Sequence, residues 1–87
     1  MNRPRLADGA RLQYDDVRDE HLLLVPEGAV RLNATAAQVL ELCDGERSVE
    51  DIAATLSERY SGADVTDDVR ALLGGMGERG LVVDAAA

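Results

Sequence analysis

Apolar and polar residues alternate in the first third of the chain, and this pattern predicts three short strands. They cover residues 11–17, 21–26 and 29–32, joined by short turns at 18–20 and 27–28. In the first strand Leu12 and Tyr14 stand between polar neighbours, which is the period of a strand with one buried face. Pro26 must end the second strand, because proline lacks the N–H that a ladder needs. The short turns favour an antiparallel meander.

After residue 33 the apolar residues recur every three or four positions, and this spacing predicts three helices. We place them at residues 34–43, 49–60 and about 65–79. Asn33 and Ser48 precede the first two helices, where a side-chain oxygen can accept a free N–H of the first turn. Asp51, three residues after Ser48, would complete a capping box. Gly45 ends the first helix, because glycine adopts the left-handed conformation of helix ends without steric cost.

These elements predict a single α+β domain over residues 1–87, with a three-stranded antiparallel sheet followed by three helices. That order is typical of winged helix-turn-helix-like domains. We expect residues 1–10 to be a loose start, residues 81–83 to be extended and residues 84–87 to be a tail. A chain of this length buries only about 60–65% of its unfolded surface, so we expect modest stability.

Charge argues against the nucleic-acid binding that many winged helices perform. Asp and Glu number 17 against nine Lys and Arg, and the formal net charge is −8. Binding to a phosphate backbone needs a basic face, whereas here the arginines form no run. Tyr14 and Tyr60 are the only aromatic residues, so bases have almost nothing to stack on. We expect a basic or zwitterionic partner, and neither nucleic acid nor a membrane, since no apolar run approaches the ~20 residues of a span.

No set of residues in the sequence has the composition of a catalytic or metal site. The chain has one His, His21, expected at a strand end, and one Cys, Cys43, expected as a small buried hydrophobe on a helix. A zinc site needs about four such ligands, and the carboxylates lack the spacing of a calcium loop. We therefore predict no enzyme, no catalytic residue, no metal and no cofactor. A single cysteine and the lack of an apolar signal segment indicate the cytoplasm.

The glycines at residues 74, 75 and 77 are unusual inside a helical pattern, where each costs up to ~1 kcal/mol relative to alanine. They lack the phosphate-loop pattern, so nucleotide binding is not indicated. Two explanations stay open. The glycines either make a tight packing contact or a fraying helix end, or they thin the helix surface so that another backbone can approach.

Several unrelated residue types recur at fixed offsets in "PEGAVRLNATAAQVLELCDGERSVEDIAATL", residues 26–56. The pattern is P-E-x-x-x-x-L-N, then A-x-x-[VI]-L-x-L-C-D-G, then [ST]-V-x-[DE]-I-x-x-x-L. It closely resembles the PqqD family of pyrroloquinoline quinone (PQQ) biosynthesis. The closing "ALLGGMGERGLV" resembles the third helix and the ending of that family. The resemblance covers about residues 3–83.

The resemblance implies a peptide chaperone, also called a recognition element for ribosomally synthesised and post-translationally modified peptides (RiPPs). Such a domain binds the precursor peptide PqqA and presents it to the radical S-adenosylmethionine enzyme PqqE. The peptide adds a strand beside the third strand of the sheet and packs against the third helix. Carried onto this sequence, that binding mode implies a peptide site made of Val30, Arg31, Leu32, Asn33, Val69, Leu72, Leu73 and Met76.

Two other functions stay open at this stage. The same fold occurs beside other peptide-modifying enzymes, so the chain is alternatively a recognition element for another modified peptide. A DNA-binding winged helix is the third reading, and it predicts salt-sensitive duplex binding. An exposed strand edge would also allow a homodimer.

Overall fold

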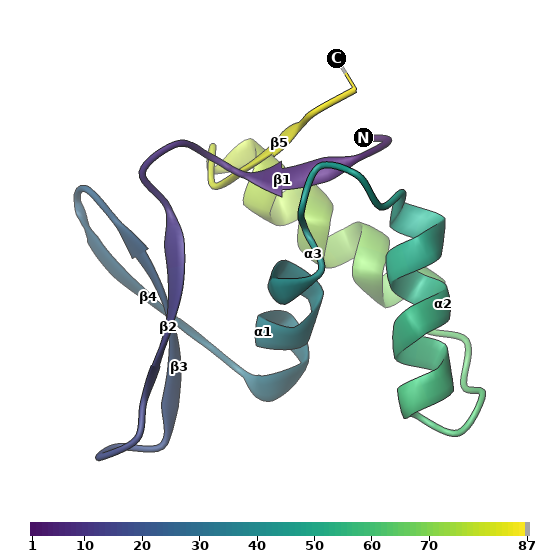
Figure 1. The fold of residues 1–87 in the computed structure, drawn as a ribbon, viewed down its shortest axis with the longest axis horizontal. Coiled ribbons are helices and arrows are strands. Elements are labelled where there is room, and N and C mark those ends of the chain that lie inside the picture. The colour runs from purple at the N-terminus through teal and green to yellow at the C-terminus, as the bar shows by residue number, and fades with distance from the viewer. Residues whose placement is uncertain (87) are drawn as a thin grey trace.

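The computed structural model describes residues 1–86 and contains two small sheets and three helices (Figure 1). In chain order the elements are β1 Pro4–Leu6, β2 Arg11–Asp15, β3 Glu20–Val25, β4 Gly28–Leu32, α1 Ala34–Glu41, α2 Val49–Arg59, α3 Thr66–Glu78 and β5 Val82–Asp84. Figure 1 shows the β2–β3–β4 sheet on one side, α1 in the middle, α2 on the other side and α3 behind them. The predicted α+β fold, with the three-stranded sheet before the three helices, is confirmed.

The three-stranded sheet has the order β2-β3-β4, and both of its pairs are antiparallel. Leu12, Leu23 and Val30 stand opposite one another across the three strands, so they share the face that the helices cover. Strand β2 ends two residues before the predicted end. The Asp15 carboxylate accepts hydrogen bonds from the N–H groups of Val17 and Arg18, and this local turn competes with further strand pairing.

Both predicted helix caps are present. The Asn33 side-chain oxygen accepts a hydrogen bond from the Ala36 N–H at 2.7 Å. The Ser48 hydroxyl accepts from the Asp51 N–H at 3.0 Å, and the Asp51 carboxylate accepts from the Ser48 N–H at 3.1 Å, which completes the capping box. Gly45 has the expected left-handed φ of +81°, but it does not end α1, which stops at Glu41 with Leu42 as its C-cap. Helices α1 and α2 therefore begin where their caps predict.

One core of aliphatic side chains joins the sheet, the three helices and β5. Leu23 of β3 and Ile52 and Leu56 of α2 all belong to this core and are fully buried. No polar or charged side chain in residues 1–86 is buried with them. Cys43 is buried as predicted, and burial, aided by the neighbouring Asp44 carboxylate, raises the pKa of its thiol to about 12.

The first ten residues are not loose, so this prediction needs correction. Strand β1 pairs antiparallel with β5, and the pairing sets Pro4 opposite Asp84. The Asp84 carboxylate also accepts hydrogen bonds from the N–H groups of Asn2 at 2.9 Å and Arg3 at 3.1 Å. A strand of three residues is too short to show a period in the sequence. The expected tail at 84–87 therefore begins inside β5, and its last residue lies outside the described residues.

Candidate functional site

Within residues 1–86 the outer edge of β4 has no partner strand. In a two-residue hairpin turn such as 26–27, the residues on either side, here Val25 and Gly28, form a hydrogen-bonded pair. Further along β3 and β4, pairs without and with mutual hydrogen bonds then alternate. The backbone groups of Val30 and Leu32 therefore face β3. Those of Ala29 and Arg31 face the open edge, where an extended chain can pair with them.

The side chains of β4 point alternately to the two faces of the sheet. Val30 and Leu32 are half-buried and pack against the core, while Arg31 is exposed on the far face of the sheet. The Arg31 guanidinium lies 3.8 Å from the partly exposed Glu20 carboxylate, a surface pair of the kind that contributes only about 0–1 kcal/mol. Asn33 follows β4 directly and is exposed apart from its capping bond.

A row of three hollows follows α3. The first lies between α1 and α3, reaches Asn33 and has a volume of about 200 Å³. The second is an open surface that includes Leu72, Gly75 and Met76. The third lies where Arg79 meets the turn at residues 26–27.

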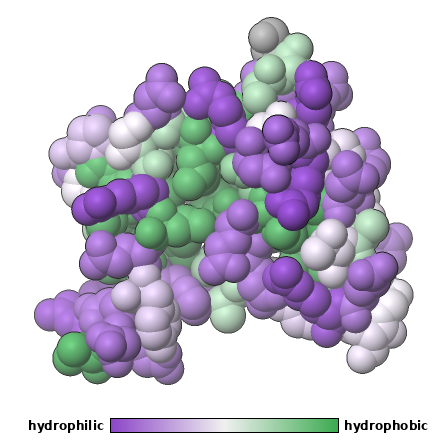
Figure 2. Space-filling view, in the orientation of Figure 1, coloured by the Kyte–Doolittle hydropathy of each residue, from purple (hydrophilic) through white to green (hydrophobic). Residues whose placement is uncertain are grey.

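Adjacent hollows share Leu72 and Arg79, so the row is continuous. It begins at Asn33, past the end of β4, and ends at the turn before Gly28, where β4 starts. We call this row the α3 groove. Figure 2 shows apolar side chains gathered between the sheet and the helices, with hydrophilic ones around them. The two ends of the groove therefore lie at the two ends of β4, and its first two hollows are mainly apolar.

The side chains that the sequence predicted for the site on α3 lie at different depths. Leu72 is half-buried and lines two of the hollows. Val69 and Met76 are 2% and 7% exposed, and each still lines one hollow of the groove. Leu73 is 1% exposed and lines a separate hollow beside Val49 of α2. The structure thus brings Leu72, Val69 and Met76 to the groove and turns Leu73 away from it.

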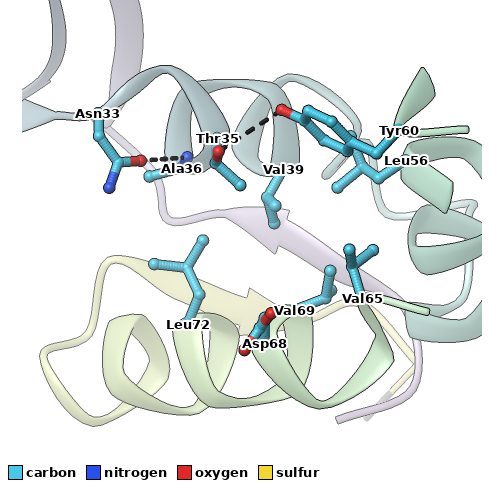
Figure 3. Close-up of a pocket in the computed structure, with 10 residues that line it drawn as sticks. All are labelled: Asn33, Thr35, Ala36, Val39, Leu56, Tyr60, Val65, Asp68, Val69 and Leu72. Atoms are coloured by element: carbon cyan, nitrogen blue, oxygen red, sulfur yellow. Dashed lines mark hydrogen bonds between the residues drawn. The ribbon is translucent and has the colours of Figure 1, made fainter. Parts of the chain in front are cut away.

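Sequence patterns missed the residues that α1, α2 and the start of α3 add to the first hollow (Figure 3). These are Thr35, Ala36, Val39, Leu56, Tyr60, Val65 and Asp68. Tyr60 was the best available signal, because it is one of two aromatic residues and ends the apolar face of α2. Its hydroxyl accepts a hydrogen bond from Gln38 Nε2 at 2.9 Å and lies 3.5 Å from the Thr35 hydroxyl.

Just before α3, the Asp64 carboxylate accepts bonds from the backbone N–H and the side-chain hydroxyl of Thr66, and these lower the pKa of Asp64. They fix the turn from which α3 starts.

Residues 1–86 contain no group of three or more His, Cys, Asp or Glu side chains placed to hold a metal ion. In the same residues, no helix combines the length and the apolar character of a membrane span.

Comparison with known proteins gives consistent results. The family model described as coenzyme PQQ synthesis protein D (PqqD) matches residues 20–82. A PqqA binding protein of Klebsiella pneumoniae (strain 342) is 48% identical over 60 residues, which are 69% of this chain and 65% of that protein, slightly under two thirds of its length. A PqqA binding protein of Kluyvera intermedia is 44% identical over 71 residues, 80% of this chain and 77% of that protein.

One solved structure has a similar fold. It is the solution NMR structure of the PqqD truncation of Methylobacterium extorquens PqqCD, described as a functional and stand-alone RiPP recognition element. The TM-score is 0.79 and the sequence identity is 35%. The match covers 92% of this chain and 87% of that one.

Proposed function

The chain belongs to the PqqD family, as its motifs indicated, and on this basis we propose that it binds the precursor peptide PqqA in PQQ biosynthesis and presents it to the radical S-adenosylmethionine enzyme PqqE. Relatives named as PqqA binding proteins and the similar fold of a RiPP recognition element support this function. The observation that carries it is the open edge of β4 beside the apolar α3 groove.

The peptide adds a strand to this edge. Ala29 and Arg31 offer their free N–H and C=O groups, and the added strand takes its affinity from these backbone bonds. Side chains on one face of the added strand then enter the α3 groove. Pockets in the groove select the peptide, because backbone pairing alone does not depend on sequence.

The proposed contacts come from two elements, the β4 edge and α3. From the sheet they are Val30, Arg31, Leu32 and Asn33, and from α3 they are Val69, Leu72 and Met76. Leu73 is buried in the core beside Val49 of α2, so its proposed role is to hold α3 against α2. A core leucine truncated to alanine costs about 2–5 kcal/mol, so changes at Leu73 would act on the fold before they act on binding.

Energetic considerations set the expected strength of binding. A disordered peptide loses about 2–5 kcal/mol when it becomes ordered on a partner, so we expect an affinity nearer micromolar than picomolar. The net charge of −8 favours a peptide or an enzyme surface that carries Lys or Arg.

Blocking the backbone at one position tests strand addition. Arg31→Pro removes an N–H that faces the open edge and leaves the pairing with β3 in place, because proline is tolerated on edge strands. Calorimetric titration with synthetic PqqA is expected to give saturable one-to-one binding to the wild type. Arg31→Pro should weaken it by about tenfold or more, since one lost hydrogen bond is worth about 1 kcal/mol and the proline ring adds a clash.

Arg31→Ala is the matched control, because it removes the same side chain and keeps the N–H. We expect its affinity to stay within about twofold of the wild type, as is usual for an exposed side chain. Circular dichroism would establish that both variants are folded. Absence of PqqA binding to the wild type would overturn the function, and a folded Arg31→Pro variant that binds normally would overturn strand addition at β4.

A further inference from the structure

The hollow between α1 and α3 has the size and lining of a pocket for one apolar side chain (Figure 3). Val39 points into it from α1, and Val69 and Leu72 point into it from α3. Its volume is about 200 Å³. An apolar cavity of about 150 Å³ already accepts a benzene ring, so a leucine, isoleucine or phenylalanine side chain fits here.

Polar groups lie at the rim of this pocket. The Tyr60 ring is held there by the Gln38 hydrogen bond to its hydroxyl. The Asn33 side-chain oxygen is already used by the Ala36 N–H. The Asp68 carboxylate also lines the pocket, is exposed and forms no ion pair with another described residue. The rim therefore offers a negative charge that has no ion-pair partner in residues 1–86, next to an apolar cavity.

The position of the pocket relates it to the proposed peptide strand. Asn33 both follows β4 and lines the pocket, so the pocket opens where the free edge ends. Both pairs of the sheet are antiparallel, and antiparallel pairing is slightly more stable per residue than parallel pairing. A peptide added antiparallel to β4 brings its N-terminal residues to this end of the groove.

Resting on the proposed function, we propose that the α1–α3 pocket is the specificity pocket of the site. It takes one large apolar side chain near the N-terminal end of the bound PqqA segment, and Asp68 pairs with a lysine or arginine beside it. Adjacent side chains of an extended strand point to opposite faces, so one enters the pocket while a long basic neighbour reaches over the rim. The pocket thus selects an apolar residue and a basic residue together.

A double-mutant cycle tests the charge contact. Asp68→Asn keeps the size of the side chain and removes its charge. We expect it to lower the affinity for synthetic PqqA about fivefold at low salt. Each Lys and Arg of the peptide is replaced in turn by Gln. One of these substituted peptides should bind the wild-type chain more weakly than PqqA does. The same peptide should bind Asp68→Asn as tightly as PqqA binds Asp68→Asn, which is the signature of direct coupling. Asp67→Asn, one position away and outside the pocket, should bind within about twofold of the wild type.

The apolar contact is tested by filling the pocket. Ala36→Leu places extra atoms in the cavity, and its PqqA affinity is expected to fall about tenfold or more. Since overpacking can unfold a small domain, methyl NMR of the wild-type chain gives a second measurement. The methyl signals of Val39, Val69 and Leu72 are expected to shift on addition of PqqA, more than those of Leu22 on the far face of the sheet.

The possible outcomes separate the two proposals. If PqqA does not bind the wild-type chain at all, the proposed function fails and the pocket assignment falls with it. If PqqA binds and Arg31→Pro weakens it, but Asp68→Asn binds normally and the pocket methyl signals do not move, strand addition stands and the specificity pocket is wrong. Coupling at Asp68 together with shifts at Val39 and Val69 would support the pocket.

Discussion

At the scale of single residues, Asn33 connects the two halves of the fold. It stands directly after β4, it caps α1 through a 2.7 Å bond from the Ala36 N–H, and it lines the α1–α3 pocket. The first N–H groups of a helix have no intrahelical partner, so a capping oxygen stabilises the start of α1. The same bond fixes the direction in which the chain leaves the sheet, and with it one end of the groove.

Removal of this cap should have a measurable cost. Asn33→Ala is expected to lower the free energy of unfolding by about 1 kcal/mol, because the Ala36 N–H loses its acceptor. Urea denaturation followed by circular dichroism gives this value. Asn33→Asp is the matched control, since aspartate caps helices as well as asparagine does. Equal stability of the Ala and Asp variants would mean that the cap contributes nothing here.

At the scale of elements, the glycines of α3 separate into two kinds. A Cβ atom added at Gly74 or Gly75 would meet no other atom within 4 Å. At Gly77 it would lie 3.1 Å from Met1 Cε and 3.8 Å from the Val82 carbonyl oxygen. Of the two explanations that the sequence left open, a tight contact inside the molecule therefore applies to Gly77 alone. Gly75 lines the α3 groove, where an absent side chain leaves room for a peptide.

A matched pair of substitutions on α3 distinguishes these roles. Gly74→Leu and Gly75→Leu should each stabilise the helix by up to about 1 kcal/mol, because leucine is a much better helix former than glycine. Only Gly75→Leu places its side chain in the groove. It alone should lower the affinity for PqqA, by about tenfold or more, because the leucine side chain sterically excludes the peptide. Thermal unfolding and calorimetric titration give the two quantities. Equal affinities of the two variants would place the peptide elsewhere on the molecule.

At the scale of the whole molecule, the two ends of the chain are held together. Strand β1 pairs with β5, and Asp84 accepts hydrogen bonds from the N–H groups of Asn2, Arg3 and Ala86. These bonds lower the pKa of the Asp84 carboxyl from its ordinary value of 3.8, and the bond from Asn2 has the largest effect. Since Pro4 of β1 and Val82 of β5 are themselves buried, the pairing of the two strands also closes one end of the core.

The lowered pKa of Asp84 predicts a contribution to acid stability. A group whose pKa is lower in the folded state adds stability above its ordinary pKa and loses it as the pH falls through the lowered value. The wild type should therefore lose stability below about pH 4. Asp84→Asn should be less stable at pH 7 and show a flatter decline in melting temperature below pH 4. Asp16→Asn, in the exposed turn between β2 and β3, is the control and should decline like the wild type.

Local sequence patterns determined the fold class, the three strands and three helices to within about two residues, the caps at Asn33 and Ser48, and the family. These features follow from the sequence because periodicity and capping act between residues at most a few positions apart. Only the tertiary structure decided the pairing of β1 with β5, the inward turn of Leu73 and the pocket that Tyr60 and Asp68 border. Each of these depends on how separate elements are rotated and placed against one another, and that arrangement is set by packing among residues far apart in the chain.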